Sequence, residues 1–388
     1  MNKIGVMHVL DTLALGGAER AAVNLVNELP RGDYRAYLCT TRMEGPLRNA
    51  LKKDVGQLAL GRRSRFDISA IRRLADYIRT QEISILHAHG SSLFVAALAA
   101  SFSPEPIVIW HAHFGRVALE NRRAWAHRFV ARKIAGAIAV NRQLAEWCRV
   151  RLAIRKDQVW YIPNMVCASL TASPDALDLP GSKGSRIVCV ANLRAEKDHI
   201  TLVRAMELVV RHHPDARLFV VGAHSDSTYS ATSAYFDAVK REVSRHSLEH
   251  HVLFLGQRED IPTVLGSCDI GVLSSKTEGL PVSLLEYGAA SLPVVATQVG
   301  ECAEVLDHGR AGVLVPPQSP AALAEGLMSL LRSRERREVL GERFSQRVKK
   351  FYSAASIMAQ VCQVYDAVLA TKRSEMSFVQ RVQSSLRA

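Results

Sequence analysis

The chain has 388 residues, of which 48% are hydrophobic and 22% are charged. This length and composition predict about two globular domains and exclude a disordered chain, a coiled coil and a small disulfide scaffold. The seven cysteines are scattered without a Cys-x-x-Cys pair, which indicates buried thiols in a reducing compartment. The sequence contains no run of about 18 uncharged apolar residues, so we expect no membrane-spanning helix.

The formal charge of +13 is unevenly distributed along the chain. Residues 1–165 contain 25 Lys and Arg against 13 Asp and Glu, whereas residues 166–388 contain 25 against 24. The basic first half favours a polyanionic partner, such as nucleic acid, anionic lipid headgroups or a phosphorylated acceptor. Since no nucleic-acid-reading motif and no interleaving of aromatic and basic residues is found, we expect no nucleic acid among the partners.

In the first half, short β-branched runs alternate with amphipathic segments, which predicts a parallel sheet covered by helices on both faces. The predicted strands are Ile4–Leu10, Ala36–Thr40, Ile83–His89, Ile107–Trp110 and Ala137–Val140. The predicted helices are Ala18–Leu29, Ile68–Thr80, Ser92–Ser101 and Arg122–Ile134. Residues 165–186 are rich in turn residues and lack periodicity, so we expect them to link two domains.

The same alternation resumes after residue 186 and continues to about residue 336, after which we expect helix and a basic, polar tail. The predicted strands are Arg186–Val190, Arg217–Gly222, Val252–Leu255, Ile270–Leu273, Pro293–Ala296 and Gly312–Val315. The predicted helices are His199–Arg211, Ser233–His246, Ile261–Gly266, Val282–Ala290 and Pro320–Ser333. The sequence therefore predicts an α/β protein with two doubly wound domains, which bind ligands at the carboxyl ends of their strands.

A pair of glycines, Gly16-Gly17, follows the first predicted strand and opens a helix. Glycines allow a ligand to approach the backbone, and the N-terminus of a helix attracts a phosphate or a carboxylate. A plain turn between strand and helix explains the same pattern equally well.

Two His-x-His motifs, His87-Ala-His89 and His111-Ala-His113, each lie at the end of a predicted strand. Alternation along a strand places both imidazoles of a pair on one face. A metal site, buried structural histidines and polar contacts at the ligand-binding edge are all consistent with this pattern. We favour the polar contacts, because the carboxyl ends of the strands belong at the cleft, and a metal site least, because no Cys, Asp or Glu lies nearby at the spacing of metal ligands.

Two motifs in the second half indicate an anion site. Arg194 and Lys197 follow the first strand of that half closely enough to converge on one anionic group, although a solvated charge cluster would look the same. Glu278-Gly-Leu-Pro281 precedes a helix that contains Glu286. The N-terminus of that helix suits a pyrophosphate, and a carboxylate suits the vicinal hydroxyls of a ribose.

Together these motifs resemble the family 4 retaining glycosyltransferases, which have the GT-B fold. The resemblance covers roughly residues 3–350, and the chain departs from the family pattern at Met165, Ala191-Asn192 and Ser291. The residues that carry it are Gly16-Gly17-Ala18-Glu19, His87-Ala-His-Gly90, Ile162-Pro-Asn164, Arg194 with Glu196-Lys197, Gly222, Glu278-Gly-Leu-Pro281 with Glu286, and Pro293-Val-Val-Ala296.

The resemblance implies two Rossmann-like domains that face a cleft, an acceptor domain over residues 1–170 and a nucleotide-sugar donor domain over residues 186–352. Residues 353–388 would form a helix over Ala355–Leu369 that crosses back to the first domain, followed by the polar tail.

The resemblance also implies the roles of single residues on the donor side. Glu286 would hold the ribose, Arg194 and Lys197 the diphosphate, and Glu278 the hydroxyls of the donor sugar. The remaining donor-binding residues are expected to be Gly16, Gly17, Gly279, Leu280 and Pro281.

A histidine of the family contacts the sugar near the reacting carbon. We assign this catalytic role to His111, since it lies closer to the end of its strand than the alternative, His113. His89, His113 and Arg116 are expected on the acceptor side.

The expected reaction transfers a sugar from a UDP- or GDP-sugar to a hydroxyl of a glycan or a lipid-linked acceptor, with retention and without a metal or another cofactor. Polysaccharide or lipopolysaccharide assembly is the expected setting, in the cytoplasm or at the inner face of its membrane. The segment Arg122–Lys133, with Trp125 and Phe129, would lie on an anionic membrane or form an ordinary helix with a solvated basic face. The alternatives are a nucleotide-sugar epimerase or hydrolase of the same fold and a hydrolase with a metal on the His-x-His motifs.

Overall fold

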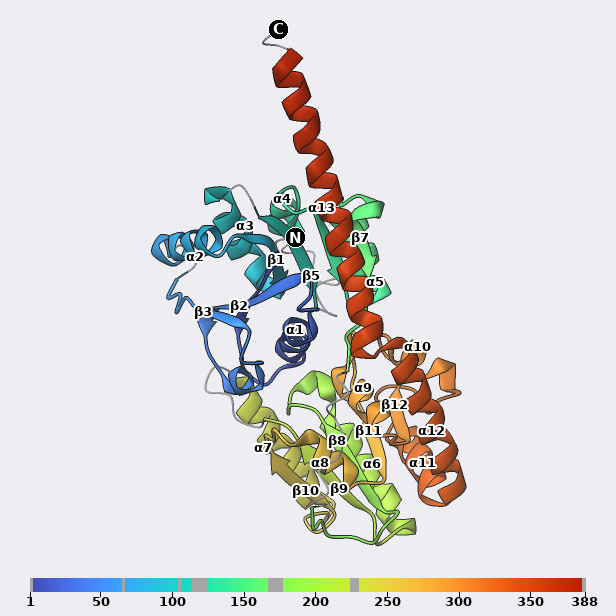
Figure 1. Ribbon diagram of the computed structural model, residues 1–388. Helices are drawn as coiled ribbons and strands as arrows, with labels where there is room; N and C mark the ends of the chain where they lie inside the picture. Colours follow the sequence, from blue (N-terminus) through green and yellow to red (C-terminus); the bar gives the residue numbers. More distant parts are fainter. Residues whose placement is uncertain are drawn as a thin grey trace. The chain divides into compact units, whose positions relative to one another are not determined.

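The computed structural model describes residues 3–64, 67–103, 106–113, 124–166, 177–223 and 230–385 (Figure 1). The chain forms two compact units. Unit 1 comprises Met1–Met165 and Ala354–Ala388, and unit 2 comprises Val166–Ser353. Each unit contains one parallel sheet with helices packed on it, which confirms the predicted α/β class.

The described part of unit 1 contains a seven-stranded parallel sheet in the order β3-β2-β1-β4-β5-β6-β7. Its strands are β1 (Ile4–Thr12), β2 (Tyr34–Met43), β3 (Gly56–Ala59), β4 (Ile83–His89), β5 (Ile107–Ala112), β6 (Gly136–Ala139) and β7 (Val159–Tyr161). The strand order reverses between β1 and β4, and in such sheets this position opens a crevice at the carboxyl ends of the strands. The five predicted strands are confirmed, whereas β3 and β7 are additional edge strands of four and three residues.

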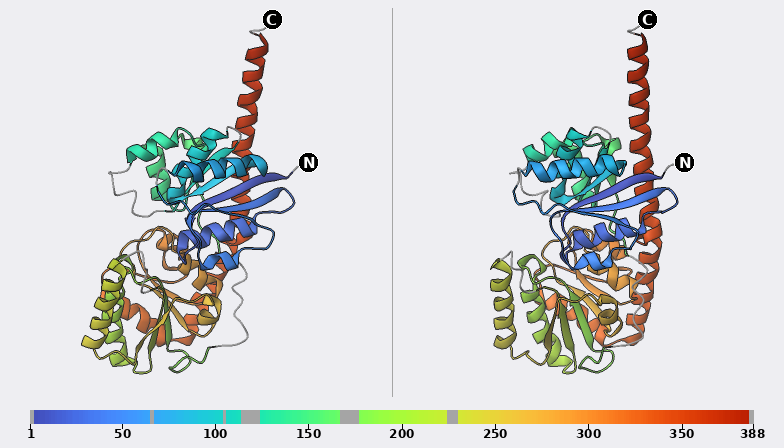
Figure 2. Two further views of the ribbon diagram at one scale, coloured as in Figure 1. Left: turned by 90° about the vertical axis from the view of Figure 1, so that its left-hand side faces the viewer. Right: turned by 60° about the vertical axis from the view of Figure 1, so that its left-hand side comes forward.

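Helices cover both faces of the sheet in unit 1 (Figure 2). They are α1 (Gly17–Glu28), α2 (Ile68–Thr80), α3 (Leu93–Phe102), α4 (Ala124–Ala131), α5 (Arg142–Arg151) and α13 (Ala354–Ser385), with the shorter η1 (Pro46–Ala50), η2 (Gly90–Ser92) and η4 (Lys156–Gln158). Helix α5 was not predicted. It begins where the side chain of Asn141 accepts a hydrogen bond from the backbone N–H of Leu144.

The C-terminal helix α13 is longer than the predicted helix Ala355–Leu369. It begins at Ala354 and continues to Ser385, so the segment that we expected to be a polar tail is helical through Ser385. No glycine or proline occurs between residues 370 and 385, so the helix meets no residue that would end it. Within unit 1, α13 packs against α1 and buries Tyr365 completely.

The described part of unit 2 contains a six-stranded parallel sheet in the order β10-β9-β8-β11-β12-β13, and its order reverses between β8 and β11. The strands are β8 (Arg186–Val190), β9 (Arg217–Val221), β10 (Val252–Gly256), β11 (Ile270–Leu273), β12 (Val294–Thr297) and β13 (Val313–Val315). The helices are α6 (His199–His212), α7 (Ser230–Arg245), α8 (Ile261–Gly266), α9 (Val282–Ala289), α10 (Cys302–Val305), α11 (Pro320–Leu331) and α12 (Arg334–Phe351), with η5 (Ala195–Lys197) and η6 (Asp307–Gly309). All six strands predicted for this half are confirmed.

In neither unit does the described part of the chain contain a helix that is both long enough and apolar enough to cross a membrane.

Candidate active site

Five histidines of unit 1 gather where the middle of β1 adjoins the carboxyl-terminal parts of β4 and β5. This histidine cluster consists of His8, His87, His89, His111 and His113. The two histidines of each His-x-His motif stack on each other, with ring centroids 4.8 Å apart in the first pair and 4.3 Å apart in the second. The prediction that both imidazoles of a pair share one face is confirmed.

Hydrogen bonds organise the cluster into two chains. In the first chain, the Tyr365 hydroxyl lies 2.6 Å from His87 Nδ1, and His87 Nε2 lies 2.9 Å from His111 Nδ1. His111 Nε2 is buried and has no partner among the described residues. The first chain therefore starts on α13 and ends on the histidine to which we assign the catalytic role.

The second chain connects β1, β4 and the residue after β5. His8 Nδ1 lies 2.9 Å from His89 Nε2, and His89 Nδ1 lies 2.8 Å from His113 Nε2. Burial lowers the pKa of His8 to about 3 and the pKa of His113 to about 4. Both imidazoles are therefore neutral at pH 7.

The histidine cluster also has the ligand type of a metal site. Two triads, one of His8, His87 and His89 and the other of His89, His111 and His113, hold their ligand atoms within 4.8 Å of one another. However, the nitrogen pairs at 2.8–2.9 Å are at hydrogen-bonding distance, and each such pair shares a proton. A metal ion would have to replace that proton, so the observed geometry is that of a hydrogen-bonded cluster.

An acidic residue that the sequence analysis missed lies near the carboxyl end of β1, one of the strands that carry the cluster. Asp11, near the end of β1, accepts hydrogen bonds of 2.5 Å from the hydroxyls of Thr41 and Ser91. The guanidinium of Arg62 lies 3.9 Å from the same carboxylate. The position of Asp11 at the end of the first strand was the available signal, because ligand-binding residues of doubly wound sheets lie there.

The two glycines after β1 occupy the position expected of them. Gly16 is the N-terminal cap of α1 in an extended conformation, and Gly17 is the first residue of the helix. The first N–H groups of a helix have no partner within it and carry the positive end of its dipole. The loop therefore presents backbone N–H donors at the carboxyl edge of the sheet, where the strand order reverses between β1 and β4.

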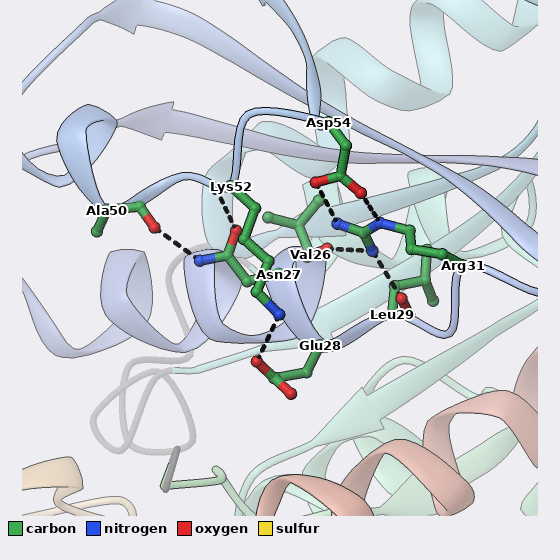
Figure 3. Close-up of polar contacts among 8 residues, drawn as sticks. All are labelled: Val26, Asn27, Glu28, Leu29, Arg31, Ala50, Lys52 and Asp54. Carbon is green, nitrogen blue, oxygen red and sulfur yellow. Dashed lines mark hydrogen bonds and ion pairs between the residues drawn. The ribbon is translucent and has the colours of Figure 1, made fainter. Parts of the chain in front are cut away.

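The other end of α1 is fixed by the polar contacts drawn in Figure 3. The Arg31 guanidinium donates to the carbonyl oxygens of Val26 and Leu29 and forms an ion pair with Asp54 at 2.5 Å. The side-chain amide of Asn27 donates to the carbonyl oxygen of Ala50 at 2.7 Å, and its Oδ1 accepts a hydrogen bond from the backbone N–H of Lys52. These bonds hold α1, and hence its glycine loop, against the segment that follows β2.

In unit 2, an ion pair joins the two neighbouring strands at which the order reverses. Lys197 Nζ, after β8, lies 2.5 Å from Glu278 Oε1, after β11. The Ser275 hydroxyl donates to the same oxygen at 2.6 Å, and the Ser274 hydroxyl donates to the Lys197 carbonyl at 2.9 Å. The structure therefore brings together two residues that the sequence analysis placed in different motifs.

Arg194 precedes Lys197 by three residues and Glu286 follows Glu278 by eight, but Arg194 is exposed and Glu286 is buried. Arg194 is exposed, and its side chain has no hydrogen bond in the described part of the chain. Glu286 is 5% exposed and lies on α9, five residues after the helix cap Pro281. Gly279 and Leu280 lie between Glu278 and Pro281, in the turn that leads into the N-terminus of α9.

Two further residues complete this edge, and neither was among the predicted site residues. Asp198 adopts a left-handed conformation at the start of α6, accepts a hydrogen bond from the Thr201 hydroxyl and lies 3.4 Å from Lys276 Nζ. Gly300 has a φ of +52°, and a Cβ there would clash with the carbonyl oxygen of Glu278. The loop after β12 thus supports the turn that holds Glu278.

The remaining assignment cannot be placed. Arg116, expected on the acceptor side, lies outside the described residues, as do Arg122 and Arg123 of the basic segment.

Family models match both halves of the chain. The model described as Glycosyltransferase Family 4 matches residues 15–169, and the model described as Glycosyl transferases group 1 matches residues 179–347. Between them, they cover the Lys197–Glu278 ion pair and the histidine cluster except for His8, which precedes the first match.

Similar proteins point in the same direction. The chain is 28% identical over 322 residues to a phosphatidyl-myo-inositol mannosyltransferase of Mycobacterium tuberculosis, a match that covers 79% of each protein. It is also 28% identical over 183 residues to the N-acetyl-alpha-D-glucosaminyl L-malate synthase of Bacillus anthracis, covering 47% of this chain and 45% of that protein. The structure resembles that of Anabaena HepE in complex with UDP and glucose, with a TM-score of 0.79 and 17% identity over 94% of this chain and 100% of that chain. The chain therefore belongs to the family 4 glycosyltransferases of the GT-B fold.

Proposed function

We propose that this glycosyltransferase moves a sugar from a UDP- or GDP-sugar to a hydroxyl of a glycan or a lipid-linked acceptor, with retention at the anomeric carbon. The observation that carries the proposal is the Lys197–Glu278 ion pair at the point where the strand order of unit 2 reverses. Two relatives support it by their descriptions: HepE was solved with UDP and glucose, and the mycobacterial protein is named for a lipid that contains inositol.

The donor diphosphate would replace Glu278 as the partner of Lys197. An incoming phosphate offers Lys197 more negative charge than one carboxylate does, and it frees Glu278 to accept hydrogen bonds from the sugar hydroxyls. Arg194, which is exposed, would supply a second cation, and the N–H groups at the start of α9 would supply dipoles. Glu286 would accept hydrogen bonds from the two ribose hydroxyls.

In the proposed reaction, the bond between the anomeric carbon and the diphosphate oxygen breaks, and a bond from the acceptor oxygen to that carbon forms on the same face. The acceptor proton passes to the leaving phosphate. Negative charge that develops on the diphosphate is stabilised by Lys197, Arg194 and the helix N–H groups, so the step needs no metal. By the family resemblance, His111 would contact the sugar near the reacting carbon.

The acceptor side is proposed to work at an anionic membrane. Arg128 in α4 is exposed, as are Arg132 and Lys133 in the turn that follows the helix, and Phe129 of α4 is 64% exposed. An exposed aromatic side chain among cations suits the interface of a membrane that contains anionic lipids. This surface would hold the enzyme at the cytoplasmic face of the membrane, where a lipid-linked acceptor for glycan assembly is presented.

The test is a panel of UDP- and GDP-sugars, scored for nucleotide release with and without a lipid extract as the source of acceptor. We expect release from one donor that depends on the extract, is unaffected by EDTA and leaves a product with the donor's anomeric configuration. Release without any acceptor would indicate the hydrolase alternative, and conversion of the donor sugar to an isomer would indicate the epimerase. An inverted product would contradict the retaining reaction.

A further inference from the structure

The hydrogen-bonded chain from Tyr365 through His87 to His111 has a direction that proton counting can determine. A neutral imidazole carries one N–H and one acceptor nitrogen, and a phenol carries one O–H. Burial lowers the pKa of His87 and of His111 well below 6.5 and raises the pKa of Tyr365 well above 10. All three groups are therefore neutral at pH 7, with one exchangeable proton each.

Two arrangements of these protons are possible. If the Tyr365 hydroxyl donates to His87 Nδ1, then His87 carries its proton on Nε2 and donates to His111 Nδ1, so His111 carries its proton on Nε2. In the reverse arrangement, His111 Nδ1–H donates to His87 Nε2, and His87 Nδ1–H donates to the Tyr365 oxygen.

The first arrangement leaves fewer buried groups unsatisfied. It leaves one group without a partner among the described residues, the His111 Nε2–H at the end of the chain. The reverse arrangement leaves two, the hydroxyl hydrogen of Tyr365 and the bare Nε2 of His111. Since each unsatisfied buried polar group destabilises the fold, the first arrangement is the stable one.

We propose that Tyr365 is a positioning residue that fixes the tautomer of His111 through His87, so that His111 presents an Nε2–H donor to a hydroxyl oxygen of the bound sugar. The proposal rests on the proposed function for the identity of the ligand. The direction of the hydrogen bonds stands without it.

The second chain, through His8, His89 and His113, contains no such anchor. Its two end atoms, His8 Nε2 and His113 Nδ1, both lack a partner among the described residues. In the described part of the chain no phenol is bonded to either end of it, so either end can carry the unpaired proton. Only the chain that ends at His111 is tied to a hydroxyl from a distant part of the sequence, 278 residues after His87.

The direct test is ¹⁵N NMR of protein labelled at histidine, in which protonated and bare ring nitrogens have distinct chemical shifts. The His87 and His111 signals are assigned with His87→Gln and His111→Gln. We expect both residues to carry the proton on Nε2 in the unmodified chain at pH 7.5. In Tyr365→Phe, which removes one oxygen, we expect His111 to become a mixture of both tautomers.

The matched control is Tyr34→Phe. Tyr34 is also buried and packs edge-on against Tyr365, with ring centroids 5.8 Å apart, but it has no hydrogen bond to a histidine of the cluster in the described structure. We expect this variant to leave the tautomer of His111 unchanged. A His111 that carries its proton on Nδ1 in the unmodified chain, or one that does not respond to Tyr365→Phe, would overturn the proposal. So would tightly bound zinc that removes the N–H signals of the cluster.

A kinetic test follows once a donor is known. Because the loss of one hydrogen bond costs about 0.5–1.5 kcal/mol, Tyr365→Phe should lower kcat about two- to thirteenfold, with the donor KM unchanged. Tyr34→Phe should leave both constants unchanged. An inactive chain with the expected tautomers would contradict the proposed function alone, whereas full activity in Tyr365→Phe would contradict a role for the tautomer in the reaction.

Discussion

The ion pair between Lys197 and Glu278 joins two residues that would each have one partner without the donor and another partner with it. Without a donor, the carboxylate partners the ammonium group, so the two charges are not left unpaired where the side chain of Glu278 is only 8% exposed. With a donor, the same two groups would separate onto the phosphates and the sugar. Under the proposed function, the residues that bind the donor would also pair with each other in its absence.

At the residue scale, Lys197→Ala should lower kcat about 10²–10³-fold, the usual cost of removing one preorganised group that stabilises developing charge. The control is Lys240→Ala, which removes an exposed lysine of α7 that pairs with Asp237. Steady-state nucleotide release measures both variants. A kcat of Lys197→Ala equal to that of the unmodified chain would contradict the assignment of this lysine to the phosphate site.

Glu286→Gln tests the nucleotide site without reference to turnover. The substitution keeps the size of a buried side chain and removes the charge that would accept the ribose hydroxyls, so UDP or GDP should bind about tenfold more weakly. Isothermal titration calorimetry gives the affinity. Glu325→Gln, an exposed glutamate on α11, should bind the nucleotide as the unmodified chain does. Equal affinities in the two variants would contradict the assignment of Glu286.

The buried histidines make the stability of unit 1 depend on pH. The pKa of His8 is lowered from 6.5 to about 3, so the unfolded chain takes up a proton in acid that the folded chain refuses. The contribution of the neutral histidine to the free energy of unfolding is fully present above pH 6.5. It falls as the pH drops from 6.5 toward 3, by about 1.4 kcal/mol per pH unit for each such histidine.

Urea unfolding between pH 7.5 and 4.5, followed by tryptophan fluorescence, measures this dependence, because all four tryptophans lie within residues 1–165. His8→Gln should reduce the slope of stability against pH by about one proton. His308→Gln, an exposed histidine of unit 2, should leave the slope unchanged. A stability that is flat across this range would show that the cluster is protonated in the folded chain.

At this scale, the sequence pointed to single residues such as Lys197 and Glu278, but not to the contacts between them. Lys197 and Glu278 were recognised from two motifs 81 residues apart, but their ion pair depends on β8 and β11 lying side by side, which no local pattern encodes. Asp198 was missed for the same reason, whereas Asp11 had a signal in the sequence, its place at the end of the first strand, that was not used. Tyr365 was missed because a tyrosine within an amphipathic helix looks like an ordinary core residue.

At the scale of elements, strands with continuous apolar runs were predictable, including the three-residue edge strand β13, whereas the edge strands β3 and β7 were not. Strand β3 has four residues with alternating exposure, and β7 has three, so neither produces a distinct hydrophobic pattern. Helix α5 carries arginines at Arg142, Arg149 and Arg151, which dilute its apolar face. The end of α13 could not be predicted, because a helix that leaves its packing partners loses its amphipathic signal before it ends.

The attachment of α1 gives a prediction for one element. Arg31→Met removes the bonds to two carbonyl oxygens at the end of α1 and the ion pair to Asp54, and should lower the free energy of unfolding by about 1–2 kcal/mol. Asp54→Asn removes only the ion pair, which is half exposed, and should cost less than about 1 kcal/mol. Urea unfolding followed by tryptophan fluorescence compares the two. Equal losses would mean that the ion pair, rather than the capping of the carbonyl oxygens, holds this end of the helix.

At the scale of the whole molecule, the division into units sharpens the asymmetry of charge. Unit 1, with the C-terminal helix included, contains 29 Lys and Arg against 15 Asp and Glu, and unit 2 contains 21 against 22. The net charges are therefore +14 and −1. A protein whose positive charge lies in one unit attracts an anionic surface through that unit, and the attraction weakens as salt screens it.

Sedimentation with vesicles of phosphatidylglycerol and phosphatidylcholine tests whether that charge acts at a membrane. We expect binding at low salt that is lost at about 0.5 M salt, where the screening length falls below about 5 Å. The double variant Arg128→Ser/Arg132→Ser should bind about 30-fold more weakly, because each cation near an anionic surface contributes about 1 kcal/mol. Phe129→Asp should also weaken binding, whereas Phe351→Asp, at an exposed phenylalanine of unit 2, should not. If the protein stays in the supernatant with anionic vesicles at low salt, the charge of unit 1 serves a soluble anion, such as a phosphorylated acceptor, and not a membrane.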